Sequence, residues 1–108
     1  MIDWGRVSEL YDEIGEDDFD EIVEIFLEEV EDVLTRLGGL SGMALAADLH
    51  YLKGSSLNLG FETLAQLCRK GETLAKDDQK VDTDEITATF HNSRQVFALG
   101  VSEKLLAS

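Results

Sequence analysis

Apolar residues recur three and four positions apart along most of the chain, which is the spacing of amphipathic helices. The pattern predicts a short first helix capped by Asp3 and four longer helices after it. The longer helices are expected over residues 17–37, 41–59 and 61–76, and from a cap within residues 82–84 onward. No segment alternates apolar and polar residues as a half-buried strand does. The chain has no proline, and glycines separate the periodic segments.

Each predicted helix carries an apolar stripe that would face a common core. In the first helix the stripe consists of Val7, Leu10, Tyr11 and Ile14. In the second it consists of Ile22, Phe26, Val30, Val33, Leu34 and Leu37, and in the last of Ile86, Phe90, Phe97, Val101 and Leu105. Short connections between long helices favour antiparallel neighbours, so we predict an all-α fold: an antiparallel up-down four-helix bundle with a short extra N-terminal helix. At 108 residues the chain is expected to form one domain, 1–108.

The composition narrows the classes of partner. Nine Lys and Arg against 23 Asp and Glu give a net charge of −14, which argues against binding to nucleic acid or to an anionic membrane surface. The single cysteine excludes an internal disulfide and indicates a reducing compartment. No apolar run has the length of a signal core or a membrane span, so a cytoplasmic monomer is expected.

The negative charge is concentrated in residues 12–32, where twelve of 21 residues are Asp or Glu and none is basic. A solvated helix face accounts for such a run of acidic residues. The alternative is an electrostatic field that steers a positively charged partner toward this helix. The acidic runs lack the spacing of a calcium-binding loop, so no metal site is predicted in this chain.

The segment 41–59 differs from an ordinary surface helix. Its core stripe is predicted at Leu45, Leu49, Leu52, Ser56 and Leu59. Wound at 100° per residue, His50 lies about 140° from the centre of that stripe. Its neighbours on the outer face are Ala46, Ala47, Gly54 and Leu57, with Met43 and Phe61 at the two ends. A nearly uncharged face of small and apolar residues around one imidazole is typical of a docking surface.

Gly54 and Lys53 indicate what this imidazole could receive. A glycine inside a helix costs about 1 kcal/mol relative to alanine, and Gly54 lies one turn after His50 on the same face. The missing side chain would expose the ring to a bulky group, and Lys53 could bring a cation beside it. Together they indicate a nucleophilic imidazole suited to an anion such as a phosphoryl group. A solvated surface histidine beside small residues that permit close helix packing is the alternative.

The segment 49–60 reads Leu-His-Tyr-Leu-Lys-Gly-Ser-Ser-Leu-Asn-Leu-Gly. It resembles the signature of the histidine phosphotransfer (HPt) domains of bacterial phosphorelays, which is His-x-Leu-Lys-Gly-Ser-Ser followed by Leu-Gly. Positions in the next helix also resemble the family, namely Leu64, Leu67, Cys68 and Glu72. The chain departs from the pattern at Leu49, Phe61 and Gly71, which bears on the partner that docks rather than on the histidine.

The resemblance implies that His50 carries a phosphoryl group on Nε2 between the aspartates of response-regulator receiver domains, in two-component signalling. Lys53 would stabilise the phosphoryl charge and Gly54 would give access to the ring. The expected partners are receiver domains and a hybrid histidine kinase, and Mg²⁺ is expected in the receiver and not in this chain, which has no cofactor of its own. The chain would be a phosphoryl carrier and not an enzyme, since it has no ATP-binding or hydrolase motif.

Two alternatives remain within this resemblance. An HPt-like adaptor would dock a receiver or a histidine kinase without being phosphorylated, although it would have no reason to keep His50, Lys53 and Gly54 together. The phosphotransfer domain of a chemotaxis-type kinase would share the fold. A di-metal bundle enzyme is excluded because its Glu-x-x-His pairs are missing: Ala47 and Ala88 precede the two histidines by three residues.

The remaining candidate residues receive simpler interpretations. Arg69 and Lys70 lie on the helix expected to flank His50, so they are predicted to contact the partner. Cys68 follows the apolar stripe of that helix and is predicted to be a buried small hydrophobe. His91 is predicted to be a surface residue, with a second acceptor site as the alternative, and Trp4 is expected to fasten the first helix to the bundle.

Overall fold

The computed structural model describes the backbone of residues 1–106 and the side chains of residues 1–104. Within this part of the chain the structure is all helical, as the pattern predicted. The elements are α1 (Trp4–Ile14), α2 (Phe19–Arg36), the short 3-10 turn η1 (Leu37–Gly39), α3 (Gly42–Leu59), α4 (Glu62–Lys76), α5 (Thr83–Val101) and the π-helical turn η2 (Ser102–Leu106). These bounds lie within two residues of those expected from the sequence.

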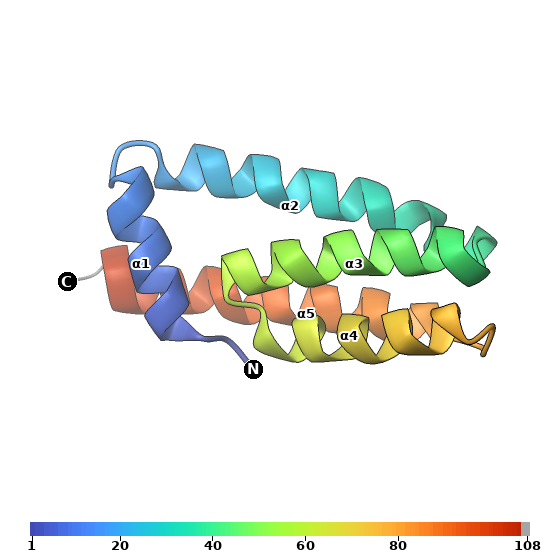
Figure 1. Cartoon of the computed structure of the whole chain (residues 1–108). Coiled ribbons are helices and arrows are strands. Elements are labelled where there is room, and N and C mark those ends of the chain that lie inside the picture. Colours follow the sequence, from blue (N-terminus) through green and yellow to red (C-terminus); the bar gives the residue numbers. More distant parts are fainter. Residues whose placement is uncertain (107–108) are drawn as a thin grey trace.

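Helices α2 to α5 run antiparallel in an elongated bundle, and α1 lies across one end of it (Figure 1). The molecule measures 47 × 21 × 18 Å along its principal axes. The turn between α3 and α4 lies at the same end as α1, whereas the α2–α3 and α4–α5 connections lie at the other end (Figure 1). The predicted up-down bundle with a short extra N-terminal helix is therefore confirmed.

Local hydrogen bonds explain where the helices begin and end. The side chains of Asp3 and Asp82 accept from the backbone N–H groups of Arg6 and Glu85 at 3.1 and 3.0 Å, which caps α1 and α5. Helix α3 ends at Gly60, whose φ of +78° lies in the left-handed region. A Cβ at this position would stand 2.8 Å from the carbonyl oxygen of Asp3, so the close approach of the N-terminal segment requires glycine.

The core is formed where the apolar stripes of the helices meet. The predicted stripe of α3 is confirmed, because Leu45, Leu49, Leu52, Ser56 and Leu59 are all buried. The α5 stripe is confirmed at its four described positions, while the side chain of Leu105 lies outside the described residues.

The predicted stripe of α2 is only partly confirmed in the first half of that helix, where Phe26 packs against the edge of the core. Phe19, Val23 and Leu27 are buried, whereas Ile22 and Phe26 are only half-buried at the edge of the stripe. Apolar residues cover a wide arc of the first half of α2. The pattern of apolar and acidic residues therefore does not determine which part of that arc faces the core.

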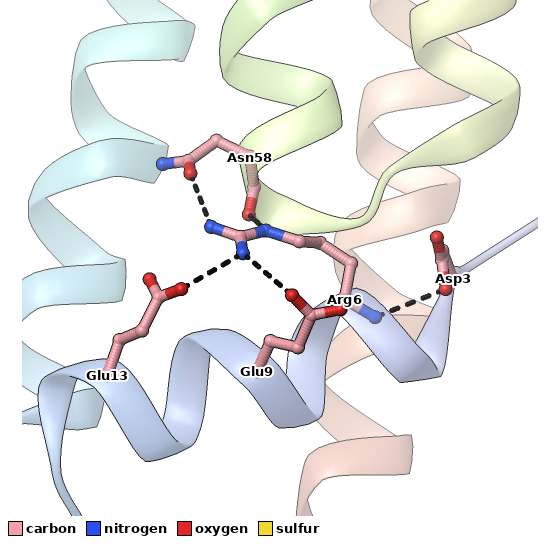
Figure 2. Close-up of polar contacts among 5 residues, drawn as sticks. All are labelled: Asp3, Arg6, Glu9, Glu13 and Asn58. Carbon is pink, nitrogen blue, oxygen red and sulfur yellow. Dashed lines mark hydrogen bonds and ion pairs between the residues drawn. The ribbon is translucent and has the colours of Figure 1, made fainter.

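Helix α1 is fastened to the bundle by an aromatic contact and by an arginine. The ring of Trp4 stacks on Phe97 with centroids 6.3 Å apart, as its predicted fastening role requires. Arg6 reaches the end of α3, where its guanidinium donates to the Asn58 backbone oxygen at 3.1 Å and to the side-chain oxygen at 2.8 Å (Figure 2). The same guanidinium pairs with two glutamates of α1, Glu9 and Glu13 (Figure 2). These contacts fix the end of α3 that follows the histidine segment.

Over the described residues, the helices fall short of the length and apolar character that crossing a bilayer demands.

Candidate functional site

His50 lies in the middle of α3, and its side chain is 69% exposed. The neighbouring Leu49 and Leu52 are completely buried, because they lie on the opposite side of the helix. The predicted orientation of His50, away from the core, is therefore confirmed. An imidazole on a rigid helix with one side free can be approached by another macromolecule without opening the fold.

Behind the ring, the Glu72 carboxylate of α4 contacts nitrogen atoms of three side chains. The Nδ1 atom of His50 lies 3.1 Å from Glu72 Oε2. Lys53 Nζ donates to Oε1 at 2.8 Å, and Lys76 Nζ lies 3.1 Å from Oε2. The Glu72 side chain is only 9% exposed, so a buried carboxylate joins α3 to α4 beneath the exposed ring. A buried charge of this kind requires paired and hydrogen-bonded partners, and the two lysines supply them.

The charge state of Glu72 determines which nitrogen of His50 is free. The hydrogen bond from Lys53, together with smaller effects of the bonds from Lys76 and His50, lowers the pKa of the Glu72 carboxyl to about 2 against the opposing effect of burial. Glu72 is thus an ionised acceptor near neutral pH, so Nδ1 of His50 carries the proton of this bond. The lone pair of a neutral ring is then on Nε2, the nitrogen that does not contact Glu72.

Gly54 leaves space on the outer face of α3. A Cβ built at Gly54 would meet no atom within 4 Å. Close packing against another helix of the bundle is therefore not the reason for a glycine here, which removes one alternative drawn from the sequence. The open space lies one turn from His50, where an incoming group would need it.

Exposed apolar side chains lie on the outer face of α3, which also carries His50, and on the adjacent helix α2. Three of them belong to α3: Met43, Tyr51 and Leu57 are 69%, 40% and 49% exposed. Ile25 of α2 is 45% exposed, and it lies one turn from Glu29, whose carboxylate accepts from the Tyr51 hydroxyl at 3.4 Å. We call these four residues, together with the exposed Ala47 and Gly54, the apolar face. The sequence pattern predicted Met43, Ala47, Gly54 and Leu57, but it missed Ile25 and Tyr51.

Two residues predicted for this face are buried instead. Ala46 is 2% exposed, because it lies on the flank of α3 against which α4 packs, and its small side chain lets the two helices approach closely. Phe61 is completely buried and packs on Phe90 and Phe97 with centroids 6.3 and 5.5 Å apart. The left-handed turn at Gly60 ends the helical progression, so Phe61 turns inward and does not continue the face.

The two predicted contacts on α4 lie on different flanks. Arg69 is exposed and precedes Glu72 by three residues, so it shares the flank of α4 that faces His50. Lys70 is also exposed, but it lines a groove of about 190 Å³ between α4 and the start of α5, beside Asp82 and Glu85. Helix α4 flanks His50 as expected, but Lys70 does not share the flank that faces His50, because successive helical residues differ by 100° in direction.

The other residues singled out from the sequence lie where they were expected. Cys68 is completely buried, and this burial raises the pKa of its thiol to about 12. His91 is exposed on α5 and borders a surface groove with Glu31 and Asp32 of α2. Within the described residues no group of three His, Cys, Asp or Glu side chains is placed to hold a metal ion.

The sequence reasoning gave no role to Glu72 or Lys76, although a signal was present. Glu72 interrupts the apolar stripe of α4, between Cys68 and Ala75, and a carboxylate on a buried stripe demands a cation. Lys76 follows Glu72 by four residues, the spacing of a helical ion pair. Lys53 reaches the same carboxylate only because α3 and α4 pack closely together. The residue pattern of a single helix does not show this packing.

Comparison with known families gives a match over most of the chain. Residues 21–99 match the family model of the Hpt domain. The matched range begins in α2 and ends within α5, so it includes the complete site and leaves α1 outside. Neither the curated proteins nor the solved structures contain a match to this chain.

Proposed function

The chain belongs to the Hpt domain family, and from this premise we propose that His50 is the residue that accepts and donates the phosphoryl group. Hpt domains are phosphoryl carriers of phosphorelays rather than enzymes, and they interact with receiver domains and kinases. For this chain we propose that the donors and acceptors are aspartates of response-regulator receiver domains, with a hybrid histidine kinase as a further partner. The exchange would take place in the cytoplasm, where receiver domains are found.

The observation that carries this proposal is the pairing of His50 with Glu72. The 3.1 Å contact between Nδ1 and Oε2 holds the ring in one tautomer and one orientation. Because the carboxylate is ionised, Nε2 presents its lone pair on the exposed side of α3. A surface histidine without a chemical role would have no need of a buried carboxylate held by two lysines.

The transfer step follows from this tautomer. Nε2 attacks the phosphorus of an aspartyl phosphate, and a nitrogen–phosphorus bond forms as the bond to the aspartate oxygen breaks. The electron pair of that bond leaves with the aspartate carboxylate. The ring becomes positively charged while it keeps its Nδ1 proton, and the Glu72 carboxylate stabilises that charge. Transfer to a second receiver is the reverse of the same step.

Lys53 contributes to this step through the carboxylate. Its ammonium is hydrogen-bonded to Glu72 Oε1 at 2.8 Å and its side chain is 23% exposed. It therefore offsets the negative charge that would otherwise repel the incoming phosphoryl group. A phosphoryl transition state needs positioning and charge stabilisation rather than covalent help from the protein. Mg²⁺ is expected in the receiver, which would supply the metal to the shared site.

The apolar face supplies the surface on which a receiver would dock. Ile25, Met43, Tyr51 and Leu57 expose large apolar groups on α3, which also carries His50, and on the adjacent helix α2. An apolar centre with a polar rim is the usual composition of a protein interface. Gly54 leaves the ring accessible from this side, because no atom of the chain occupies the space a Cβ would take.

Intact-mass measurement tests the proposal directly. The chain is incubated with a panel of phosphorylated, Mg²⁺-loaded receivers, together with the variants His50→Gln and His91→Gln. We expect wild type and His91→Gln to gain one acid-labile phosphoryl group and His50→Gln to gain none. His50→Gln should keep its helical content, because the side chain faces away from the core.

The other outcomes are equally informative. A phosphoryl gain on His50→Gln but not on His91→Gln would move the acceptor to His91 and overturn the proposal. Measurable docking of a receiver without any phosphoryl gain would indicate an adaptor that is not phosphorylated.

A further inference from the structure

We propose that Lys76 is a second cationic side chain for the phosphoryl group: it leaves Glu72 and binds a phosphoryl oxygen as the group is transferred to His50, and it keeps this contact while His50 carries the group. This inference rests on the proposed function of His50. It starts from one shared atom, since Lys76 Nζ and His50 Nδ1 each lie 3.1 Å from Glu72 Oε2. The two nitrogens are therefore no further apart than twice that distance. The phosphoryl group is bound at Nε2 of the same ring, so Lys76 has to leave Oε2 to reach it.

The two lysines on Glu72 differ in their freedom to move. Lys53 has Oε1 to itself, at 2.8 Å, and its side chain is only 23% exposed. Lys76 shares Oε2 with the histidine, and its side chain is 54% exposed in the last turn of α4. Its contact with Glu72 joins an exposed ammonium to a buried carboxylate, so solvent screens it more than the Lys53 contact, and the flexible side chain of Lys76 regains entropy when it leaves. Lys76 is thus the lysine that can leave at the lower cost.

Phosphorylation changes the charges that Lys76 faces. A phosphoryl group brings about two negative charges and three acceptor oxygens, whereas Glu72 offers one charge that Lys53 already neutralises in part. The phosphorylated ring also keeps its Nδ1 proton on Oε2, so this oxygen needs Lys76 less than before. The new electrostatic attraction is therefore toward the phosphoryl group, and Glu72 keeps Lys53 and the ring as partners.

The neighbouring cation on the same flank differs from Lys76 in one respect. Arg69 is exposed and precedes Glu72 by three residues. Among the described residues, however, no ion pair joins Arg69 to the Glu72 carboxylate. Lys76 is fixed to that carboxylate before the phosphoryl group arrives. Its ammonium is consequently already next to the reacting ring.

A small-molecule phosphoryl donor has no docking surface, so its use distinguishes a role of Lys76 in phosphoryl transfer from a role in partner binding. Phosphoramidate transfers its phosphoryl group to Nε2 as its own nitrogen–phosphorus bond breaks, and ammonia leaves. The initial rate of phosphoryl gain is measured by intact mass for the full chain and for Lys76→Gln, Lys76→Arg and Lys76→Glu. Lys80→Gln is the matched control, since it removes the same charge at an exposed position in the α4–α5 connection.

We expect Lys76→Gln to slow phosphoryl gain about tenfold, because one hydrogen bond between charged groups is lost from a solvent-exposed side chain. Lys76→Arg should retain nearly the full rate, Lys76→Glu should be slower than Lys76→Gln, and Lys80→Gln should match wild type. A rate that follows the charge at position 76 comes from that charge and not from packing. Circular dichroism of each variant confirms that the exposed substitution has left the fold intact.

Two results would overturn the proposal for Lys76 in different ways. Equal rates for wild type and Lys76→Gln, or an arginine variant as slow as the glutamine variant, would remove the role of Lys76 and leave His50 as the acceptor. A wild-type chain that gains no phosphoryl group from phosphoramidate or from any phosphorylated receiver would remove the proposed function itself. If only phosphorylated receivers serve as donors, we expect the same order of phosphoryl-gain rates among the variants with receivers as with phosphoramidate.

Discussion

At the scale of single residues, Glu72 is the group whose charge the site depends on most. Its carboxyl titrates with a pKa of about 2 in the folded chain, chiefly because Lys53 donates to it. The unfolded chain lacks that donor, so its Glu72 takes up a proton at higher pH than the folded chain. The stabilisation from Glu72 is therefore complete above the unfolded pKa and is lost as the pH falls toward 2.

The variant Glu72→Gln should show this dependence. We expect it to lower the free energy of unfolding at pH 7 by about 1–2 kcal/mol, because the two lysines lose a charged acceptor. The difference from wild type should narrow as the pH falls from 5 to 3. Urea unfolding at several pH values measures it, with the exposed Glu28→Gln on α2 as the control. A difference that stays constant over this range would mean that Glu72 contributes packing and not charge.

Cys68 is the second residue whose environment predicts its chemistry. Its side chain is fully buried, and burial raises the pKa of the thiol to about 12. Since the thiolate is the reactive form, alkylation by iodoacetamide at pH 8 should be about two orders of magnitude slower in the folded chain than in urea. Mass spectrometry over time measures both rates. Equal rates would show that α4 opens readily around this position.

At the scale of helices, the sequence predicts the elements well because their signals are local. Asp3 and Asp82 cap the helices that follow them, and Gly60 ends α3, so the helix bounds need no knowledge of the packing. The orientation of α3 is equally local, because its charged residues are few and four of its five leucines form one buried stripe. His50 and Gly54 were therefore found from the sequence.

What the sequence did not predict depends on contacts between helices. Ala46 is buried because α4 packs against that flank of α3, and Phe61 is buried because the chain turns inward after Gly60. Glu72 and Lys76 join the site only when α3 and α4 are placed side by side. The position of each residue on its own helix was predictable, whereas the partner it meets across the helix pair was not.

Gly54 gives a prediction about α3 as a helix. Its missing side chain leaves open space, so Gly54→Ala should raise the free energy of unfolding by about 0.5–1 kcal/mol through helix propensity alone. Gly54→Leu should also fold, but it should slow phosphoryl exchange with receivers much more than exchange with phosphoramidate, which needs no docking. Ala88→Leu, at an exposed position of α5, is the control for an added leucine. Equal slowing with both donors would mean that Gly54 acts on the ring and not on docking.

At the scale of the whole molecule, the charge distribution is strongly unbalanced. The net charge is −14, and residues 12–32 hold twelve acidic residues and no basic ones. Ion pairs offset part of this charge, since Arg94 of α5 holds Glu24 and Glu31 of α2, and Arg36 holds Asp48. With nine Lys and Arg against 23 Asp and Glu, most carboxylates must be balanced by solvent and counterions.

Added salt should therefore stabilise the fold. Between 10 and 300 mM NaCl the screening length falls from about 30 Å to below 8 Å, which weakens the repulsion along α2 more than it weakens the few close pairs. We expect Tm to rise by about 5 °C, which corresponds to about 1 kcal/mol for a domain of this size. A double variant, Glu21→Gln with Glu28→Gln, removes two exposed charges of α2 and should show a smaller rise. A Tm that falls with salt would mean instead that the ion pairs of Arg36 and Arg94 outweigh the repulsion. The acidic helix would then contribute to the stability of the bundle, and partner steering would not be needed to account for its charge.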